Sequence, residues 1–186
     1  NTKKLKSLKE LYRIGQGPSS SHTMGPRLAA EKYLRRHPDA NAFRVTLYGS
    51  LAATGKGHLT DQAIWEVLGK DRTEFVWHPE ITLPFHPNGM KFEVATPRGS
   101  FTEAWTVFSI GGGALVEEGK VQTETPDVYD LDRLADIKKW CEQRGMSYWE
   151  YVETCEGPEI WDYLQTVWDT MCAAVERGLE HEGVLP

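Results

Sequence analysis

The amino-acid sequence predicts a body of mixed α and β structure followed by a helical C-terminal third. Two patterns lead to this prediction. Between residues 43 and 110, apolar residues alternate with polar ones in short segments, which is typical of half-buried strands. From residue 130 onward, apolar residues recur instead at the three- and four-residue spacing of amphipathic helices.

The N-terminal part is predicted to contain two helices, one on each side of a polar loop. Leucines at near-helical spacing predict a short helix over residues 2–14. The second helix follows the loop over residues 25–38, since Pro26 suits a first-turn position and Pro38 ends the run of helix formers.

The central part is predicted to be rich in strands. Alternating apolar residues in AFRVTLYG indicate the first strand. A glycine-rich turn over residues 49–61 then leads into a helix with Thr60 or Asp61 as its N-cap. Further strands are predicted in EFVWHPEITL, MKFEVAT and FTEAWTVFSI, separated by turns that contain proline and glycine.

Three helices are predicted in the C-terminal third. The first runs from Asp130 to Gly145, and the second follows an N-cap at Ser147. The third is the clearest, because apolar residues from Ile160 to Leu179 form one continuous helix face.

Composition limits the classes of function. The chain has 186 residues, 40% of them apolar, which suffices for one folded domain with a core. Its net charge of −6 argues against binding to nucleic acid or to an anionic membrane. No segment approaches the ~20 apolar residues of a membrane span, and no signal peptide is evident, so a cytoplasmic protein is expected. Cys141, Cys155 and Cys172 lack metal-binding spacing and are predicted to be reduced structural thiols.

The segment GQGPSSSHTMGP places several hydroxyls and one imidazole directly before a predicted helix. Backbone N–H groups and the helix dipole at such a position favour a small anion. Ser19, Ser20, Ser21 and Thr23 add hydroxyl donors, and His22 adds a group that titrates near neutral pH. The alternative is that the hydroxyls only cap the helix and satisfy turn backbone, and composition alone does not choose between the two.

A second segment, GKGHLTD, has the same chemistry. Lys56 is cationic, its flanking glycines allow close backbone approach, and His58 and Thr60 precede another helix. Two such segments in one small domain predict a shared polar pocket. Other sites have less support, because the histidines lack zinc-ligand spacing and no GxSxG elbow is present. SIGGG is interpreted as a tight turn after a strand rather than as an anion loop.

The motifs together resemble a specific family. IGQGPSSSHTMGPRLAA is similar to the signature of the iron–sulfur-dependent bacterial L-serine dehydratases, in their β domain or β subunit. The resemblance continues in order through LYGSLAATGKGHLTD, LPFHPNGMKFE, FSIGGG and MCAAVERGLEHEGVLP. It therefore covers nearly the whole chain.

The resemblance implies a lyase of amino-acid catabolism and gluconeogenesis that removes water from L-serine and yields pyruvate and ammonia. It also implies a [4Fe–4S] cluster, held by a separate catalytic α domain, that acts as a Lewis acid on the substrate hydroxyl. The chain is then a single β domain over residues 1–186, without the α domain and without a metal or cofactor of its own. The expected partners are the α domain or subunit, L-serine and further copies of the chain in a homo-oligomer.

The resemblance further implies a fold and a site. The family's β domain is similar to the allosteric substrate-binding domain of some phosphoglycerate dehydrogenases. An α/β (α+β) fold with a mixed β-sheet and flanking helices is therefore expected. Catalytic roles are implied for His22, His58 and Thr60, with acid and base left unassigned. Substrate binding is implied for Ser19, Ser20, Ser21, Thr23 and Lys56. The alternative function is a regulatory module that binds serine or another small anion without taking part in turnover.

We predict that the isolated chain purifies without the brown colour of an iron–sulfur cluster. The reason is that its three cysteines do not match the cluster ligands of the family. Visible absorption spectra with iron and sulfide analysis check this prediction. Stoichiometric iron and sulfide in the pure chain would contradict it.

Overall fold

The computed structural model describes residues 5–118 and 127–183, which divide into two compact units. The first unit holds residues 15–118. The second unit holds residues 5–14 and 127–183. The sequence prediction is that residues 1–186 form one β domain of the family. A division into two compact units does not test this, so it stays a prediction.

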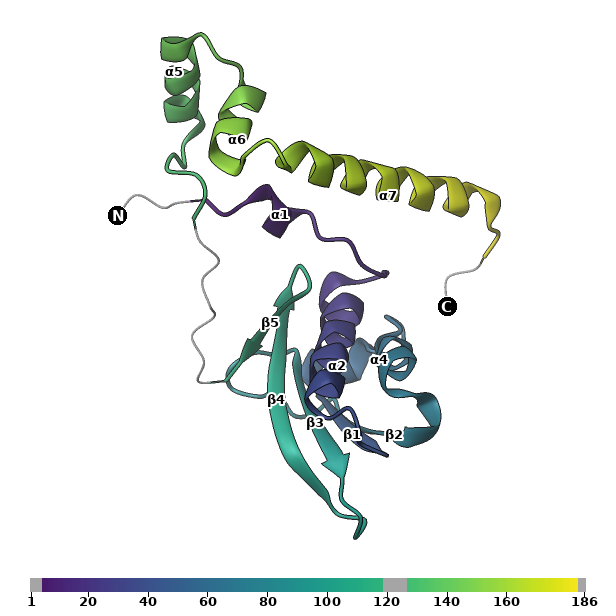
Figure 1. The fold of residues 1–186 in the computed structure, drawn as a ribbon. Coiled ribbons are helices and arrows are strands. Elements are labelled where there is room, and N and C mark those ends of the chain that lie inside the picture. The colour runs from purple at the N-terminus through teal and green to yellow at the C-terminus, as the bar shows by residue number, and fades with distance from the viewer. Residues whose placement is uncertain (1–4, 119–126, 184–186) are drawn as a thin grey trace. The chain divides into compact units, whose positions relative to one another are not determined.

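The first unit is built on a five-stranded mixed sheet, which confirms the predicted fold class (Figure 1). The strands lie in the order β2-β1-β3-β4-β5; β1 and β2 are parallel, and the other neighbours are antiparallel. The register pairs Val45 with Phe75 on one side and with Phe92 on the other. The strands are β1 (Phe43–Tyr48), β2 (Thr73–His78), β3 (Gly89–Ala95), β4 (Phe101–Gly111) and β5 (Ala114–Glu117).

Helices cover one face of this sheet. Helix α2 (Gly25–Arg36) and helix α4 (Thr60–Leu68) lie side by side over it (Figure 1). Burial of a large apolar side chain contributes about 1.5–3 kcal/mol, so the common core fixes both helices on the sheet. The core consists of buried apolar side chains from both layers: Ala29, Ala30, Tyr33, Phe43, Val45, Leu47, Leu51, Ile64, Leu68, Met90, Phe92, Val94 and Val107.

The connection from β1 to α4 differs from the predicted glycine-rich turn. Its first part is a short helix, α3 (Gly49–Thr54), because Leu51 is buried in the core and alanines follow it. The predicted N-cap at Thr60 or Asp61 is wrong. Leu59, at φ 58°, occupies the cap position and Thr60 is the first residue of α4, with its hydroxyl bonded to a carbonyl of another loop.

Two further details of the sheet differ from the sequence prediction. Strand β2 ends at His78, because Pro79 has no N–H to donate and the chain turns there. Strand β5 was not predicted, since it has only four residues and follows three glycines with positive φ, Gly111 to Gly113. These glycines make the tight turn between β4 and β5, which confirms the interpretation of SIGGG as a turn.

The described part of the second unit is mainly helical, which confirms the predicted C-terminal third. Helix α5 (Leu134–Arg144) begins later than predicted and ends at Gly145 in the left-handed conformation. Helix α6 (Tyr148–Glu156) starts with a capping box between Ser147 and Glu150. Helix α7 (Ile160–Glu180) is the longest.

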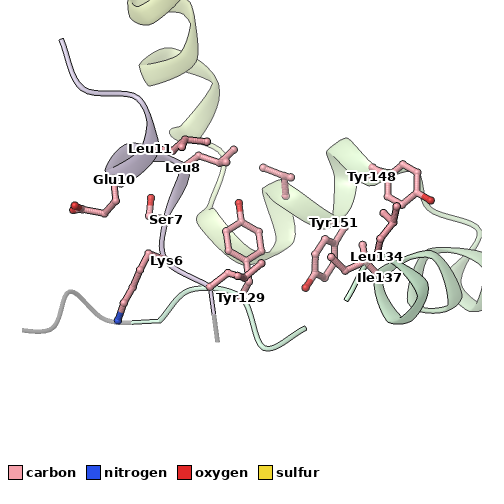
Figure 2. A pocket seen from close by; sticks show the side chains of 12 residues that line it. Lys6, Ser7, Leu8, Glu10, Leu11, Tyr129, Leu134, Ile137, Tyr148 and Tyr151 are labelled. Carbon is pink, nitrogen blue, oxygen red and sulfur yellow. The ribbon is translucent and has the colours of Figure 1, made fainter. Parts of the chain in front are cut away.

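The predicted N-terminal helix is only one turn, α1 (Leu8–Leu11). Residues 2–4 of that prediction lie outside the described part of the chain, and Leu5 forms an isolated bridge with Tyr129. A cavity of about 630 Å³ lies between α1, α5 and α6 (Figure 2). Its lining is largely apolar and includes none of the predicted site residues.

Helix α7 presents an apolar stripe to its surroundings. Trp168, Met171, Val175 and Leu179 are 55–83% exposed and follow one another at helical spacing. Among the described residues no helix combines the length and the apolar character that a membrane crossing requires.

Glu156 joins the N-terminal segment to the C-terminal helices. Its carboxylate accepts hydrogen bonds from the Ser7 hydroxyl and the Leu8 N–H, both at 2.6 Å, and from the Tyr129 hydroxyl at 2.8 Å. Burial raises the pKa of Glu156, but these hydrogen bonds outweigh it and hold the pKa below its ordinary value.

We predict that Glu156→Gln destabilises this unit at neutral pH by about 1–2 kcal/mol, since it removes hydrogen bonds to a partly buried charge. A carboxyl whose pKa is lowered on folding stabilises the folded state above its ordinary pKa of 4.5. That stabilisation is lost as the pH falls through the lowered value. Thermal unfolding at neutral and acidic pH should therefore show a smaller acid destabilisation for the variant. The exposed Glu142→Gln is the matched control, and equal behaviour of the two variants would refute the assignment.

Candidate functional site

A π-helical turn, η1 (Ser20–Met24), precedes α2 and carries His22. Ser19 caps this turn: its hydroxyl accepts the N–H of His22 at 3.2 Å, and its carbonyl accepts those of Thr23 and Met24. These three N–H groups are therefore occupied within the turn. Capping is thus observed for Ser19, and an anion at this position would be left with the donors of Ser20 and Ser21.

The structure brings together the two histidines that the sequence singled out. The ring centroids of His22 and His58 are 4.8 Å apart, with an angle of 37° between the ring planes. His22 belongs to η1, and His58 lies in the loop between α3 and α4. Two segments 36 positions apart in the sequence thus contribute to one imidazole pair.

Two threonines hold these segments to each other. The Thr23 hydroxyl donates to the His58 carbonyl at 2.7 Å, and the Thr60 hydroxyl donates to the His22 carbonyl. Both threonines are buried, with at most 2% of their surface exposed. We call Thr23 and Thr60 the reciprocal threonine pair, because each bonds to the histidine of the other segment. The roles predicted for them, substrate binding for Thr23 and catalysis for Thr60, stay predictions.

Both ring nitrogens of His22 face serine hydroxyls. Nδ1 is 2.9 Å from Ser21 Oγ, and Nε2 is 3.1 Å from Ser50 Oγ. Burial lowers the pKa of His22, the neighbouring His58 lowers it further, and a hydrogen bond with the backbone of Ser50 offsets part of this. The His22 ring is therefore neutral at pH 7 and can accept a proton.

His58 has a different kind of partner. Its Nδ1 is 2.9 Å from the carbonyl oxygen of Thr54 at the end of α3. Because a carbonyl only accepts, Nδ1 carries the proton and Nε2 is the acceptor of the neutral ring. The environment of His58 thus specifies one tautomer.

The other predicted substrate-binding residues lie at the surface of the same region. Ser20 is exposed, and Ser21 is half-buried with its hydroxyl on His22. Lys56 is exposed, and its ammonium lies 5.4 Å from the centre of the Trp77 ring. The roles predicted for these residues in substrate binding stay predictions.

Two further motifs reach this region, and the sequence analysis assigned them no role. The Ser50 N–H donates to the Pro87 carbonyl of the HPNG turn at 3.2 Å. Asn88 of that turn exchanges two hydrogen bonds with the backbone of Ser109 in SIGGG. The Ser109 hydroxyl is fully buried without a hydrogen-bond partner and lies against Gly25 at the start of α2. The signal that could have found Ser50 and the HPNG turn was their position inside the family motifs.

The cysteines do not form a metal site. Cys141 is buried, Cys155 and Cys172 are partly exposed, and all three are free thiols. No group of three or more histidine, cysteine or acidic side chains suited to a metal ion occurs in residues 5–118 and 127–183. The residues present therefore do not fit an iron–sulfur cluster.

Comparisons with known proteins give one consistent result. The family model described as serine dehydratase beta chain matches residues 7–73 and 66–120. The L-serine dehydratase of Mycobacterium bovis is 34% identical over 97% of this chain and 50% of its own length. L-serine dehydratase 2 of Escherichia coli is 31% identical over 97% of this chain and 50% of its own length. The L-serine dehydratase of Helicobacter pylori is 44% identical over 81% of this chain and 43% of its own length.

The chain spans about half the length of these curated relatives. The alignment with the Mycobacterium relative covers 232 positions, more than the 186 residues of this chain, so that relative contains residues with no counterpart here. The two matches to the family model overlap at residues 66–73, between the end of α4 and the start of β2.

We predict that Gly25→Ala destabilises the first unit by roughly 1–3 kcal/mol, as overpacking does, although alanine normally favours a helix. A Cβ at this position would overlap Ser109, 2.9 Å from its Cβ, and would push η1 away from β4. Gly178→Ala in α7 has open space and is the matched control, expected to be neutral or stabilising. Adding Ser109→Gly to Gly25→Ala should recover part of the loss in chemical denaturation. No recovery would show that the overlap is not the cause.

Proposed function

The chain belongs to the serine dehydratase beta chain family, and from this premise we propose that it contributes the His22–His58 pair to the active site of an L-serine dehydratase. The observation that carries the proposal is the contact of the two imidazoles, each from a different family-like motif. The lowered pKa of His22 supports it, because a proton acceptor must be neutral at the working pH.

Dehydration of L-serine removes the α-hydrogen as a proton and the β-hydroxyl as water. The resulting aminoacrylate tautomerises to an imine, and water hydrolyses this imine to pyruvate and ammonia. One imidazole of the pair would take the α-proton, and the other would give a proton to the departing hydroxyl. Neutral His22 and the Nε2 of His58 both fit the accepting role, so we leave the assignment of acid and base open.

The substrate carboxylate needs hydrogen-bond donors or a cation beside the imidazoles. Ser20 and Ser21 provide hydroxyls and the first N–H groups of η1, and Lys56 provides an exposed ammonium. Ser19 and Thr23 already bond within the protein, so they would act by holding η1 in place.

The complete enzyme would need a second part. A [4Fe–4S] cluster, when bound, supplies a Lewis acid for the substrate hydroxyl. We assign it to the α domain or subunit, because the described residues of this chain offer no suitable ligand set. The exposed apolar stripe of α7 gives such a partner a surface to bury. A homo-oligomer, a cytoplasmic location and inactivity of the isolated chain stay predictions.

A regulatory serine-binding module remains the alternative function. The same donors would then bind serine or another small anion, and the imidazoles would not exchange protons with it. The contact between the two histidines favours the catalytic proposal, because binding of a carboxylate alone does not need a neutral imidazole.

We predict that His58→Ala lowers kcat/KM of the complete enzyme, this chain with its α partner, by about 10²–10⁴, as expected for loss of a proton carrier. Initial rates of pyruvate formation measure this. His181→Ala, an exposed histidine after α7, is the matched control and should retain full activity. A variant that keeps kcat but loses activation or cooperativity would instead support the regulatory function.

A further inference from the structure

The short helix α3 contacts both histidines of the site, one at each end. At its start, Ser50 Oγ lies 3.1 Å from His22 Nε2. At its end, the Thr54 carbonyl lies 2.9 Å from His58 Nδ1. The sequence analysis assigned this segment no function, and the structure makes it the element that both imidazoles share.

Ser50 is itself held firmly by its surroundings. Its N–H donates to the Pro87 carbonyl at 3.2 Å, and its carbonyl accepts the Thr54 hydroxyl at 3.0 Å. Gly49, at φ 49°, allows the close approach, since a Cβ there would lie 2.7 Å from the Pro87 oxygen. The backbone of Ser50 is therefore held in place by contacts that do not involve His22.

Helix α3 offers the two histidines different hydrogen-bonding groups, a hydroxyl to His22 and a carbonyl to His58. The carbonyl that faces His58 can only accept, so it specifies a single tautomer. The hydroxyls of Ser21 and Ser50 that face His22 can each donate or accept. His22 can therefore change tautomer without turning its ring, while His58 cannot do so without losing a hydrogen bond.

We propose that Ser50 is a positioning residue for His22, holding the ring toward His58 by a hydroxyl that serves either tautomer. Ser50 acts from the Nε2 side, and Ser21 from the Nδ1 side. Ser21 is the chain neighbour of His22 and moves with it. Ser50 is 28 positions away and ties the ring to another element of the fold. Partners of this kind orient an imidazole and set its basicity.

The proposal rests on the proposed function only for its catalytic consequence. If His22 carries protons in the complete enzyme, removal of the Ser50 hydroxyl leaves its ring oriented toward His58 for only part of the time. We then expect Ser50→Ala to lower kcat, because the ring is oriented less well, with little change in KM.

The decisive experiment does not depend on activity. Long-range ¹H–¹⁵N spectra of the histidine rings in this chain report tautomer and titration for each ring. We expect Ser50→Ala to change the His22 nitrogen shifts and the ratio of its two tautomers, while His58 keeps the proton on Nδ1. Ser50→Thr retains the hydroxyl and should restore the wild-type pattern. Ser20→Ala, an exposed hydroxyl of the same turn, should leave both rings unchanged.

The outcomes separate the two proposals. Unchanged His22 nitrogen shifts and an unchanged tautomer ratio in a folded Ser50→Ala variant overturn the positioning role. If Ser50→Ala fails to fold, Ser50→Cys retains a side chain of similar size with a weaker donor and gives the same readout. A normal spectroscopic response combined with full turnover of His22→Ala in the complete enzyme would overturn the proposed function and leave the positioning role intact.

Discussion

The geometry of the site depends on two hydrogen bonds that cross between its two loops. Thr23 and Thr60 each donate a hydroxyl to the carbonyl of the histidine in the opposite loop. Both side chains are buried, so water cannot replace either bond, and a carbonyl left without its donor would cost about 1–3 kcal/mol. The reciprocal threonine pair therefore fixes the spacing of the two backbones, and the contact between the imidazoles follows from that spacing.

This spacing has an electrostatic consequence. A second protonated imidazole at 4.8 Å would repel the first, and partial burial of His22 adds a desolvation cost. The pair therefore favours states in which His22 is neutral, which is the state a proton acceptor requires. The hydroxyls of Ser21 and Ser50 satisfy the ring without imposing a charge on it.

The relatives show how far the likeness extends. The family model matches residues 7–120, which include all of the described sheet and the helices that cover it. The Mycobacterium and Escherichia relatives align over 97% of the chain, so the sequence likeness extends into the helical unit. That unit exposes the apolar stripe of α7.

The sequence by itself determined the kinds of elements in the chain. The strand alternation, the apolar face of α7 and the N-cap at Ser147 could be predicted from the sequence, because periodicity and capping act within a few residues. His22 and His58 could likewise be predicted as site residues, since each lies among small polar residues before a helix. Sequence patterns could not identify α3 as a helix, because the burial of Leu51 that stabilises it comes from distant residues.

Only the tertiary structure decided what the site residues do to one another. Thr60 was predicted to be an N-cap, but its hydroxyl donates instead to the carbonyl of His22, 38 positions earlier. Periodicity and local chemistry gave no signal for Ser50, a single serine in a six-residue helix, and only its position inside a family motif pointed to it. Its importance arises from a contact across 28 positions. Hydrogen bonds of this kind depend on distances that the packed sheet and helices set, and no local pattern in the chain encodes them.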